Sequence, residues 1–139
     1  MSLPNNFVFD TNALISAALS KNSISAQAYD RAFTIGSIAI SKPLINEFID
    51  VLFRKKLDRY FLSEDERLEP VLFLETHAIE FEIMEKIMDS TDPDDNMILE
   101  LAVASHASCI ISGDKKHLLT LHPFRGIPIL SASDFLKVF

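Results

Sequence analysis

The sequence predicts an α/β fold built on a mostly parallel central sheet of four to five strands. Three short apolar runs are uninterrupted by polar residues, which is typical of strands buried on both faces. They are residues 7–9, 38–40 and 109–111. Helical patterns lie between these runs, and strands that alternate with helices pair in parallel through right-handed crossovers.

Two further segments are expected at the margins of the sheet. Residues 127–130 contain Pro128, and a proline within a strand is found mainly at sheet edges. In residues 79–83 apolar side chains alternate with acidic ones, which is typical of a half-exposed fifth strand or of the end of a helix.

Helices are predicted from capping signals and from apolar residues at helical spacing. The segments are residues 25–35, 43–53, 96–106 and 133–138, with a short helix after Asp10. Pro43 lies near the start of its helix, where proline is tolerated. Ser63 is followed three residues later by Glu66, a capping-box pattern that predicts one more helix start.

Composition bounds the class of protein. A chain of 139 residues with 48% hydrophobic and 24% charged residues is typical of one globular domain, so we expect residues 1–139 to form a single domain. Cys109 is the only cysteine, which excludes a disulfide within the chain, and no Cys/His cluster has zinc spacing. With only three glycines, the chain has none of the common glycine-rich phosphate-binding motifs.

The net charge of −7 argues against a protein that coats DNA non-specifically. A nucleic-acid ligand would need a local basic patch or a bound cation. No apolar run approaches the ~20 residues of a membrane span. The first residues lack the basic and long apolar regions of a secretory signal. We therefore expect a cytoplasmic protein that does not contact membranes.

A few acidic residues are placed differently from those that decorate helices. Asp10 and Asp114 follow the first and third predicted strands, and Glu47 lies about one turn into the helix after the second. Asp94 and Asp95 open the helix over 96–106. Ligands of open parallel sheets bind at the carboxyl ends of strands. Clustered carboxylates there would take up protons or bind a cation, and hard oxygen ligands suit Mg²⁺ or Mn²⁺.

Each of these acids also has a plainer interpretation. An aspartate between a strand and a helix is often an N-cap, which fits Asp10, Asp95 and Asp114. Glu47 taken alone is typical of a solvated helix residue. These acids therefore indicate a site only because they occur together.

The same residues carry a resemblance to the PIN domain (PilT N-terminal) family. The matching segments, in order, are residues 7–12, Glu47 with its neighbours 44–48, residues 92–96 with 98–102, residues 112–114, and residues 126–136. The resemblance implies a three-layer α/β/α sandwich. It is strongest to bacterial PIN proteins that are toxins of toxin–antitoxin pairs.

The resemblance implies a metal-dependent ribonuclease that hydrolyses RNA phosphodiester bonds with Mg²⁺ or Mn²⁺. The implied catalytic and metal-binding residues are Asp10, Glu47, Asp95 and Asp114. The spacing to Ile98 and Ala102 favours Asp95 over Asp94, which would then cap the helix or support the site from outside. Asn12 and Ser112 match polar positions near the cluster, although a turn asparagine and a strand-end hydroxyl are equal alternatives.

Candidate contacts to RNA phosphates are basic residues near the acids. Lys115 and Lys116 follow Asp114 directly. A second basic run comprises Arg54, Lys55, Lys56 and Arg59, for which a solvated surface is the plainer interpretation. The implied partners are RNA, an antitoxin and a second copy in a homodimer. Apolar segments 48–53 and 72–81 would line such contacts or belong to the core.

Two other functions remain open from the residues alone. One is a non-catalytic PIN-fold binding module, and the other is a different Mg²⁺-dependent phosphohydrolase. A haloacid-dehalogenase phosphatase would need an acid where Asn12 stands, and a receiver domain would need adjacent acids where Asp10 is followed by Thr11. Metal-dependent RNA cleavage that is lost in Asp10→Asn would separate the enzyme from the module.

Overall fold

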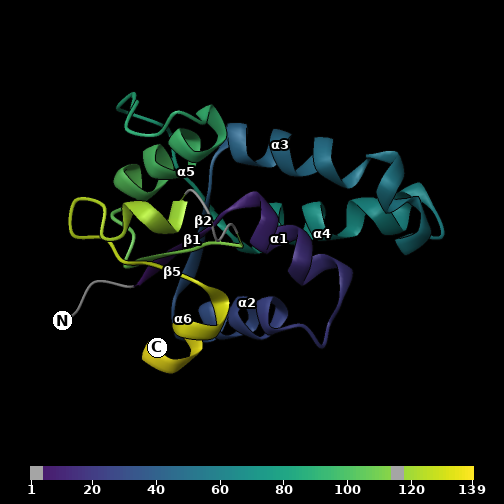
Figure 1. Ribbon diagram of the computed structural model, residues 1–139. Coiled ribbons are helices and arrows are strands. Elements are labelled where there is room, and N and C mark those ends of the chain that lie inside the picture. Colours follow the sequence, from purple (N-terminus) through teal and green to yellow (C-terminus); the bar gives the residue numbers. More distant parts are fainter. Residues whose placement is uncertain (1–4, 114–117) are drawn as a thin grey trace.

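A computed structural model describes residues 5–113 and 118–139. At its centre is a five-stranded sheet in the order β3-β2-β1-β4-β5, with every neighbouring pair parallel (Figure 1). The strands are β1 (Asn6–Phe9), β2 (Ser37–Ile40), β3 (Ile79–Glu80), β4 (Cys109–Ile111) and β5 (Ile129–Leu130). The expected α/β class and the upper strand count are confirmed.

Helices cover both faces of the sheet and complete three layers. They are α1 (Thr11–Leu19), α2 (Ile24–Ile35), α3 (Lys42–Leu52), α4 (Glu64–His77), α5 (Pro93–Ala104) and α6 (Ala132–Val138). Two 3₁₀ helices are η1 (Lys55–Tyr60) and η2 (Leu118–Leu121). Helices α2 and α6 lie on one face, and α3 and α5 lie on the other (Figure 1). Within the described residues, no helix has the length and apolarity needed to cross a membrane.

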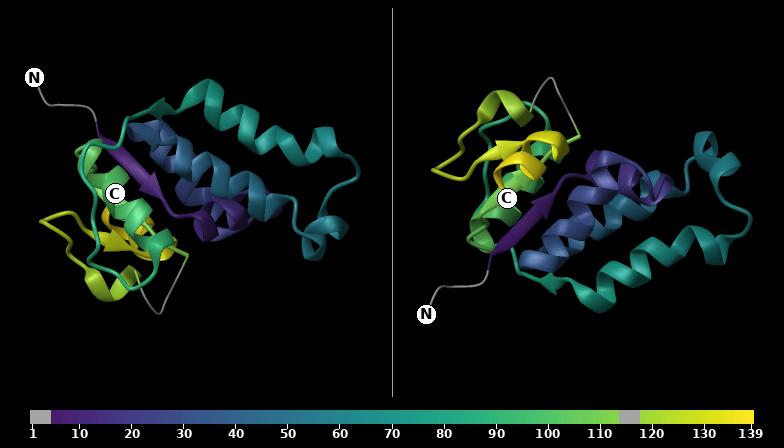
Figure 2. Two further views of the ribbon diagram at one scale, coloured as in Figure 1. Left: turned by 90° about the horizontal axis from the view of Figure 1, so that it is seen from above. Right: turned by 90° about the horizontal axis from the view of Figure 1, so that it is seen from below.

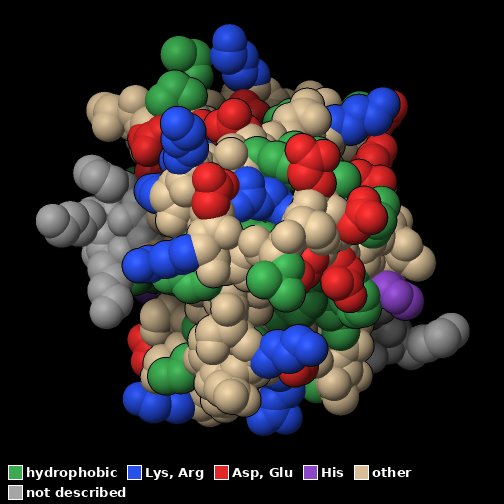
Figure 3. Space-filling view, turned by 90° about the vertical axis from the view of Figure 1, so that its right-hand side faces the viewer, with side chains coloured by type: hydrophobic (Ala, Val, Ile, Leu, Met, Phe, Trp, Pro, Cys, Tyr) green, Lys and Arg blue, Asp and Glu red, His purple; other side chains and the backbone are tan. Residues whose placement is uncertain are grey.

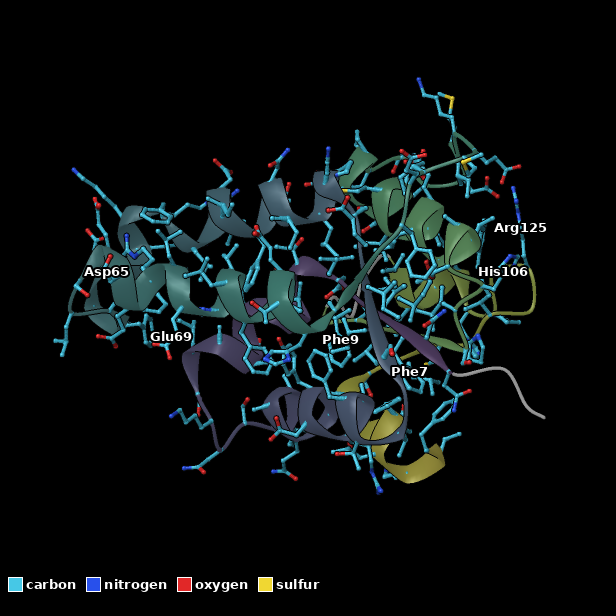
Figure 4. All side chains as sticks on the ribbon, turned by 180° about the vertical axis from the view of Figure 1, so that it is seen from behind. Phe7, Phe9, Asp65, Glu69, His106 and Arg125 are labelled. Atoms are coloured by element: carbon cyan, nitrogen blue, oxygen red, sulfur yellow. The ribbon has the colours of Figure 1, made fainter. Side chains whose placement is uncertain are left out.

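The middle strands are buried on both faces, which explains their uninterrupted apolar sequences. Phe7, Val8 and Phe9 of β1 have no exposed surface. Phe7 packs edge-on against Phe135 of α6, with ring centroids 5.2 Å apart, and Phe9 packs against Tyr29 of α2 at 5.7 Å. Both rings therefore fill the space between the sheet and the α2–α6 layer (Figure 4).

The edge strands are short and partly exposed. Of residues 79–83, only Ile79 and Glu80 form a strand, β3, which begins just after α4 ends at His77. Strand β5 covers Ile129–Leu130 at the other edge, and Pro128 precedes it, as expected of a proline that cannot donate to the ladder.

One helix start differs from the sequence expectation. Helix α5 begins at Pro93, three residues before the expected Asn96. The side chain of Asp92 accepts a hydrogen bond from the Asp94 backbone N–H at 2.9 Å and is therefore the N-cap. The interpretation of Asp95 as an N-cap is wrong, because Asp95 already lies in the first helical turn.

The caps expected at Asp10 and Ser63 are confirmed, and serines that the sequence analysis did not single out cap other helices. Asp10, Ser41, Ser63 and Ser131 cap α1, α3, α4 and α6. Helices α3 and α4 form an antiparallel hairpin, joined by η1, that projects beyond the sheet (Figure 2). As a result, the C-terminal half of α3 and η1 lie next to the start of α1, which follows β1, and next to the start of α5.

Candidate active site

One cleft, with a volume of about 320 Å³, collects acidic side chains from separate parts of the chain. Its acidic lining consists of Asp10, Glu47, Asp92, Asp94 and Asp95. Asp10 follows β1, Glu47 lies on α3, and the other three surround the start of α5. The fold thus brings the sequence-predicted acids within the described residues to one place.

Asp10 is held by hydrogen bonds from several directions. Its side chain is buried, and Oδ1 accepts hydrogen bonds from the backbone N–H groups of Ala13 at 2.8 Å and Gly113 at 3.0 Å. The Ser112 hydroxyl donates to Oδ2 at 2.5 Å. Asp10 is therefore both the N-cap of α1 and the link between the ends of β1 and β4.

Gly113 is required at this link because of close backbone packing. A Cβ at this position would lie 3.0 Å from both the Ala13 backbone nitrogen and the Asn12 Cβ. Such distances are tighter than ordinary van der Waals packing, so a side chain would push β4 away from the start of α1. The sequence marks Gly113 only as part of a motif, and its packing role becomes visible in the structure.

Glu47 has a different environment from Asp10. It is half-buried on α3 and faces Asp94 of α5. Burial raises the pKa of the Glu47 carboxyl above its ordinary value, and the nearby Asp94 charge raises it further, while Arg54 opposes the shift. The two carboxylates are close enough to hydrogen-bond when one of them holds a proton.

Asp95 and Asp94 occupy adjacent but distinct positions in the cleft. Asp95 is 7% exposed, and its Oδ2 accepts a hydrogen bond from the Ser90 hydroxyl at 3.1 Å. Asp94 is exposed and is the acid that faces Glu47. Asp92 also lines the cleft, a position that sequence reasoning missed. Its place directly before Pro93 is the N-cap signal that would have found it.

Of the other predicted site residues, some line the cleft, some lie outside its lining, and some are not described by the structure. Asn12 lines the cleft and is exposed, whereas Ser112 is buried behind it on Asp10. Arg54 and Lys56 also line the cleft, while Lys55 and Arg59 do not. Asp114, Lys115 and Lys116 lie outside the described residues.

The chemistry of these side chains fits a hard divalent cation. The donors are carboxylate oxygens, which hard cations prefer. The negative charge of Asp94 helps to raise the pKa of Glu47, and a bound cation would offset that charge. Across residues 5–113 and 118–139, however, no three His, Cys, Asp or Glu side chains are arranged to hold one ion. Glu47 and Asp94 form an acidic pair in the cleft.

Comparison with known proteins points to one family. The family model of the PIN domain matches residues 6–116. A chain in the crystal structure of VapBC2 from Rickettsia felis, bound to a DNA fragment from their promoter, is 17% identical with a TM-score of 0.57, and the match covers 91% of this chain and 97% of that one. PAE2754 from Pyrobaculum aerophilum is 15% identical with a TM-score of 0.61, covering 96% and 88%. No curated protein sequence matches. Because both sequence identities are below 20%, these two similarities establish the fold of the chain and not its activity.

Proposed function

The chain belongs to the PIN domain family, and we propose that it is a metal-dependent ribonuclease that hydrolyses phosphodiester bonds in RNA. The observation that carries the proposal is the gathering of Asp10, Glu47 and Asp94 in one cleft. Nothing in the local sequence around any of them demands this convergence. An arrangement in which Glu47 and Asp94 repel each other lowers stability, so a ligand that relieves the repulsion is the physical reason to keep it.

The residues that would hold Mg²⁺ or Mn²⁺ are Glu47, Asp94 or Asp95, Asp10 and Asp114. The bound ion would supply charge neutralisation at phosphate and a more acidic water molecule. The chain itself holds Asp10 in a fixed position, because three donors point at its carboxylate. Glu47 faces Asp94, and a bound cation would offset the repulsion that helps to raise the pKa of Glu47.

A direct test compares two carboxylates on the same helix. We expect purified wild-type protein to cleave single-stranded RNA in Mg²⁺ or Mn²⁺ and to stop in EDTA. Glu47→Gln should lower the cleavage rate by about 100-fold or more, the loss typical when a group that stabilises transition-state charge is removed. Asp50→Asn is the matched control, because Asp50 is exposed on α3, one turn further on, and lies outside the cleft lining.

The same assay decides between the two adjacent aspartates of α5. If Asp94 is the working acid, Asp94→Asn should match the loss in Glu47→Gln, and Asp95→Asn should retain more activity. The reverse order would assign the role to Asp95, as the sequence spacing favours. Equal activity of wild type, Glu47→Gln and Asp50→Asn would contradict the ribonuclease proposal.

A non-catalytic binding module is the second candidate, favoured by one observation. The oxygens of Asp10 already accept hydrogen bonds from Ala13, Ser112 and Gly113. A module would bind RNA or a protein without turnover. Metal-dependent cleavage by the wild type rules this candidate out, and phosphate release from a small phosphomonoester would instead favour a phosphatase.

We also infer that the chain is the toxin of a toxin–antitoxin pair and forms a homodimer. The support for the toxin is the fold shared with a chain of the VapBC2 structure. Exposed apolar side chains on the hairpin, Phe53, Leu72 and Phe73, offer surface for partners. Expression of the chain should arrest growth, and co-expression of a small neighbouring reading frame should relieve the arrest. Growth arrest that persists in Glu47→Gln would contradict a toxic nuclease.

A further inference from the structure

The cleft has a basic end as well as an acidic one. Within the described chain, Arg54 and Lys56 are the Lys and Arg side chains that line it. They belong to a basic run that also includes Lys55 and Arg59, but those two side chains lie outside the cleft lining. The Arg59 guanidinium instead lies 4.9 Å over the Tyr60 ring. The fold thus divides one basic run into cleft-facing and outward-facing cations.

The segment that carries these cations is held firmly against α4. The guanidinium of Arg67 on α4 donates to Asp58 at 2.8 Å and lies over the rings of Phe53 and Phe61, at 5.3 and 5.2 Å. Arg67 is nearly buried, and so is Leu57 in the middle of the segment. These interactions anchor both ends and the middle of the turn, so Arg54 and Lys56 are presented from a fixed backbone.

Both cations are available to a ligand. Arg54 forms an ion pair with Asp50 at 3.5 Å, but the two side chains are 49% and 72% exposed, so the pair contributes little stability and exchanges readily. Lys56 is exposed and makes no ion pair with the described residues. Arg54 is also near enough to Glu47 to lower the pKa of that carboxyl, although burial and the Asp94 charge raise it by more.

No broad basic field surrounds this end of the molecule. On the face at the free end of the hairpin, acidic and basic side chains are interspersed (Figure 3). The net charge of −7 repels a polyanion at long range. A nucleic-acid strand that reaches the acids therefore needs cations inside the cleft itself.

We propose that Arg54 and Lys56 form a phosphate-binding subsite for single-stranded RNA, next to the phosphodiester that the acids cleave. This inference rests on the proposed ribonuclease function. A guanidinium fork can bind two oxygens of one phosphate, and an ammonium adds a point charge. Together they hold the strand where the acidic end of the cleft alone would repel it.

The test compares two double variants that remove the same charge from the same segment. Arg54→Gln/Lys56→Gln removes the cleft-facing cations, and Lys55→Gln/Arg59→Gln removes the outward-facing ones. All four side chains are exposed, so both proteins should fold. Binding of a short fluorescein-labelled RNA of random sequence is measured by anisotropy in EDTA, which stops metal-dependent cleavage, over a series of salt concentrations.

We expect the cleft-facing variant to raise Kd about fivefold or more. Its slope of log Kd against log salt should fall by about 0.7 for each phosphate that the protein no longer neutralises, while the control pair stays close to wild type. In cleavage assays the same variant should raise KM with little change in kcat. Equal weakening in both pairs, no weakening, or no RNA binding by wild type would overturn the subsite.

The binding readout keeps this inference separable from the proposed function. If wild type binds RNA through Arg54 and Lys56 but does not cleave it, the ribonuclease proposal fails and the subsite stands. If wild type cleaves RNA and the two double variants behave alike, the subsite fails and the ribonuclease proposal stands.

Discussion

Asp10 and Glu47 are carboxylates in the same cleft with opposite environments. Asp10 is 6% exposed and accepts hydrogen bonds from two backbone N–H groups and one hydroxyl. Glu47 is half-buried, faces the carboxylate of Asp94, and receives no hydrogen bond from the described residues other than one shared with that acid. One acid is stabilised by the fold, and the other is destabilised by it.

The difference separates a carboxylate that holds the fold together from one that does not. Three donors make Asp10 part of the architecture, because they tie the start of α1 to the end of β4. Glu47 contributes nothing comparable to the fold and carries a raised pKa. A half-buried acid that the surrounding structure disfavours is a candidate for ligand binding. Substitutions at the two positions should therefore have opposite effects on stability.

The largest expected effect is the loss of stability in Asp10→Ala. The variant loses an N-cap and the carboxylate that accepts hydrogen bonds from the Ser112 hydroxyl and the Gly113 N–H. We expect a decrease of about 3 kcal/mol in the free energy of unfolding, measured by urea denaturation at neutral pH.

Ser23→Ala is the matched control for Asp10→Ala. Ser23 also caps a helix, but its hydroxyl is at the surface, so its loss should cost about 1 kcal/mol or less. If the two variants lose the same stability, the hydrogen bonds between Asp10 and β4 do not hold the fold together.

The next effect is stabilisation by a divalent cation. Mg²⁺ or Mn²⁺ should bind the folded cleft and relieve the repulsion between Glu47 and Asp94, which raises Tm in differential scanning fluorimetry. At a concentration 100 times Kd, the gain is about 2.7 kcal/mol. The double variant Glu47→Gln/Asp94→Asn should lose most of the shift, and Asp50→Asn should keep it. A Tm that does not respond to either cation would contradict a metal site here.

The smallest effect, and the one of opposite sign, is expected for Glu47→Gln. Because the folded state binds the Glu47 proton more tightly than the unfolded chain, wild-type stability falls as pH rises from the ordinary value of 4.5 through the raised pKa. The neutral glutamine removes this loss. Without metal, the variant should be slightly more stable than wild type at pH 7.

The pH dependence provides the check on Glu47→Gln. Below pH 4.5 both proteins carry a neutral side chain at position 47, so their difference in stability should shrink toward zero. Thermal unfolding in EDTA at a series of pH values measures it. A variant less stable than wild type at pH 7 would show that Glu47, like Asp10, serves the architecture.

Features that depend on nearby residues were predictable from the sequence. Residues 7–9 and 109–111 predicted strands β1 and β4 because long-range burial leaves a local mark, an unbroken apolar run. Ser63 predicted a helix start because a cap joins groups three residues apart. The start of α5 was misplaced because three aspartates in residues 92–95 compete for the cap, and side-chain geometry at Asp92 decides among them.

Within the candidate site, the sequence identifies the acidic and basic residues but does not show which of their side chains lie in the cleft. Asp94 and Asp95 are neighbours in the sequence, and spacing favours the second. The packing of α3 against α5 places Asp94 next to Glu47, whereas Asp95 accepts a hydrogen bond from the Ser90 hydroxyl. Likewise, the turn after α3 sends Arg54 and Lys56 into the cleft and leaves Lys55 outside.

The amino-acid sequence by itself determined the α/β class, the central strands, the helix caps at Asp10 and Ser63 and the identity of the acids, because each depends on neighbours within a few residues or on a period set by the backbone. Tertiary structure decided which charges meet. The approach of α3 to α5, and of β4 to the start of α1 at Gly113, depends on packing between segments far apart in the chain. Coulomb interactions change over a few ångströms, so only that packing distinguishes an acid surrounded by hydrogen-bond donors from one placed against a second carboxylate.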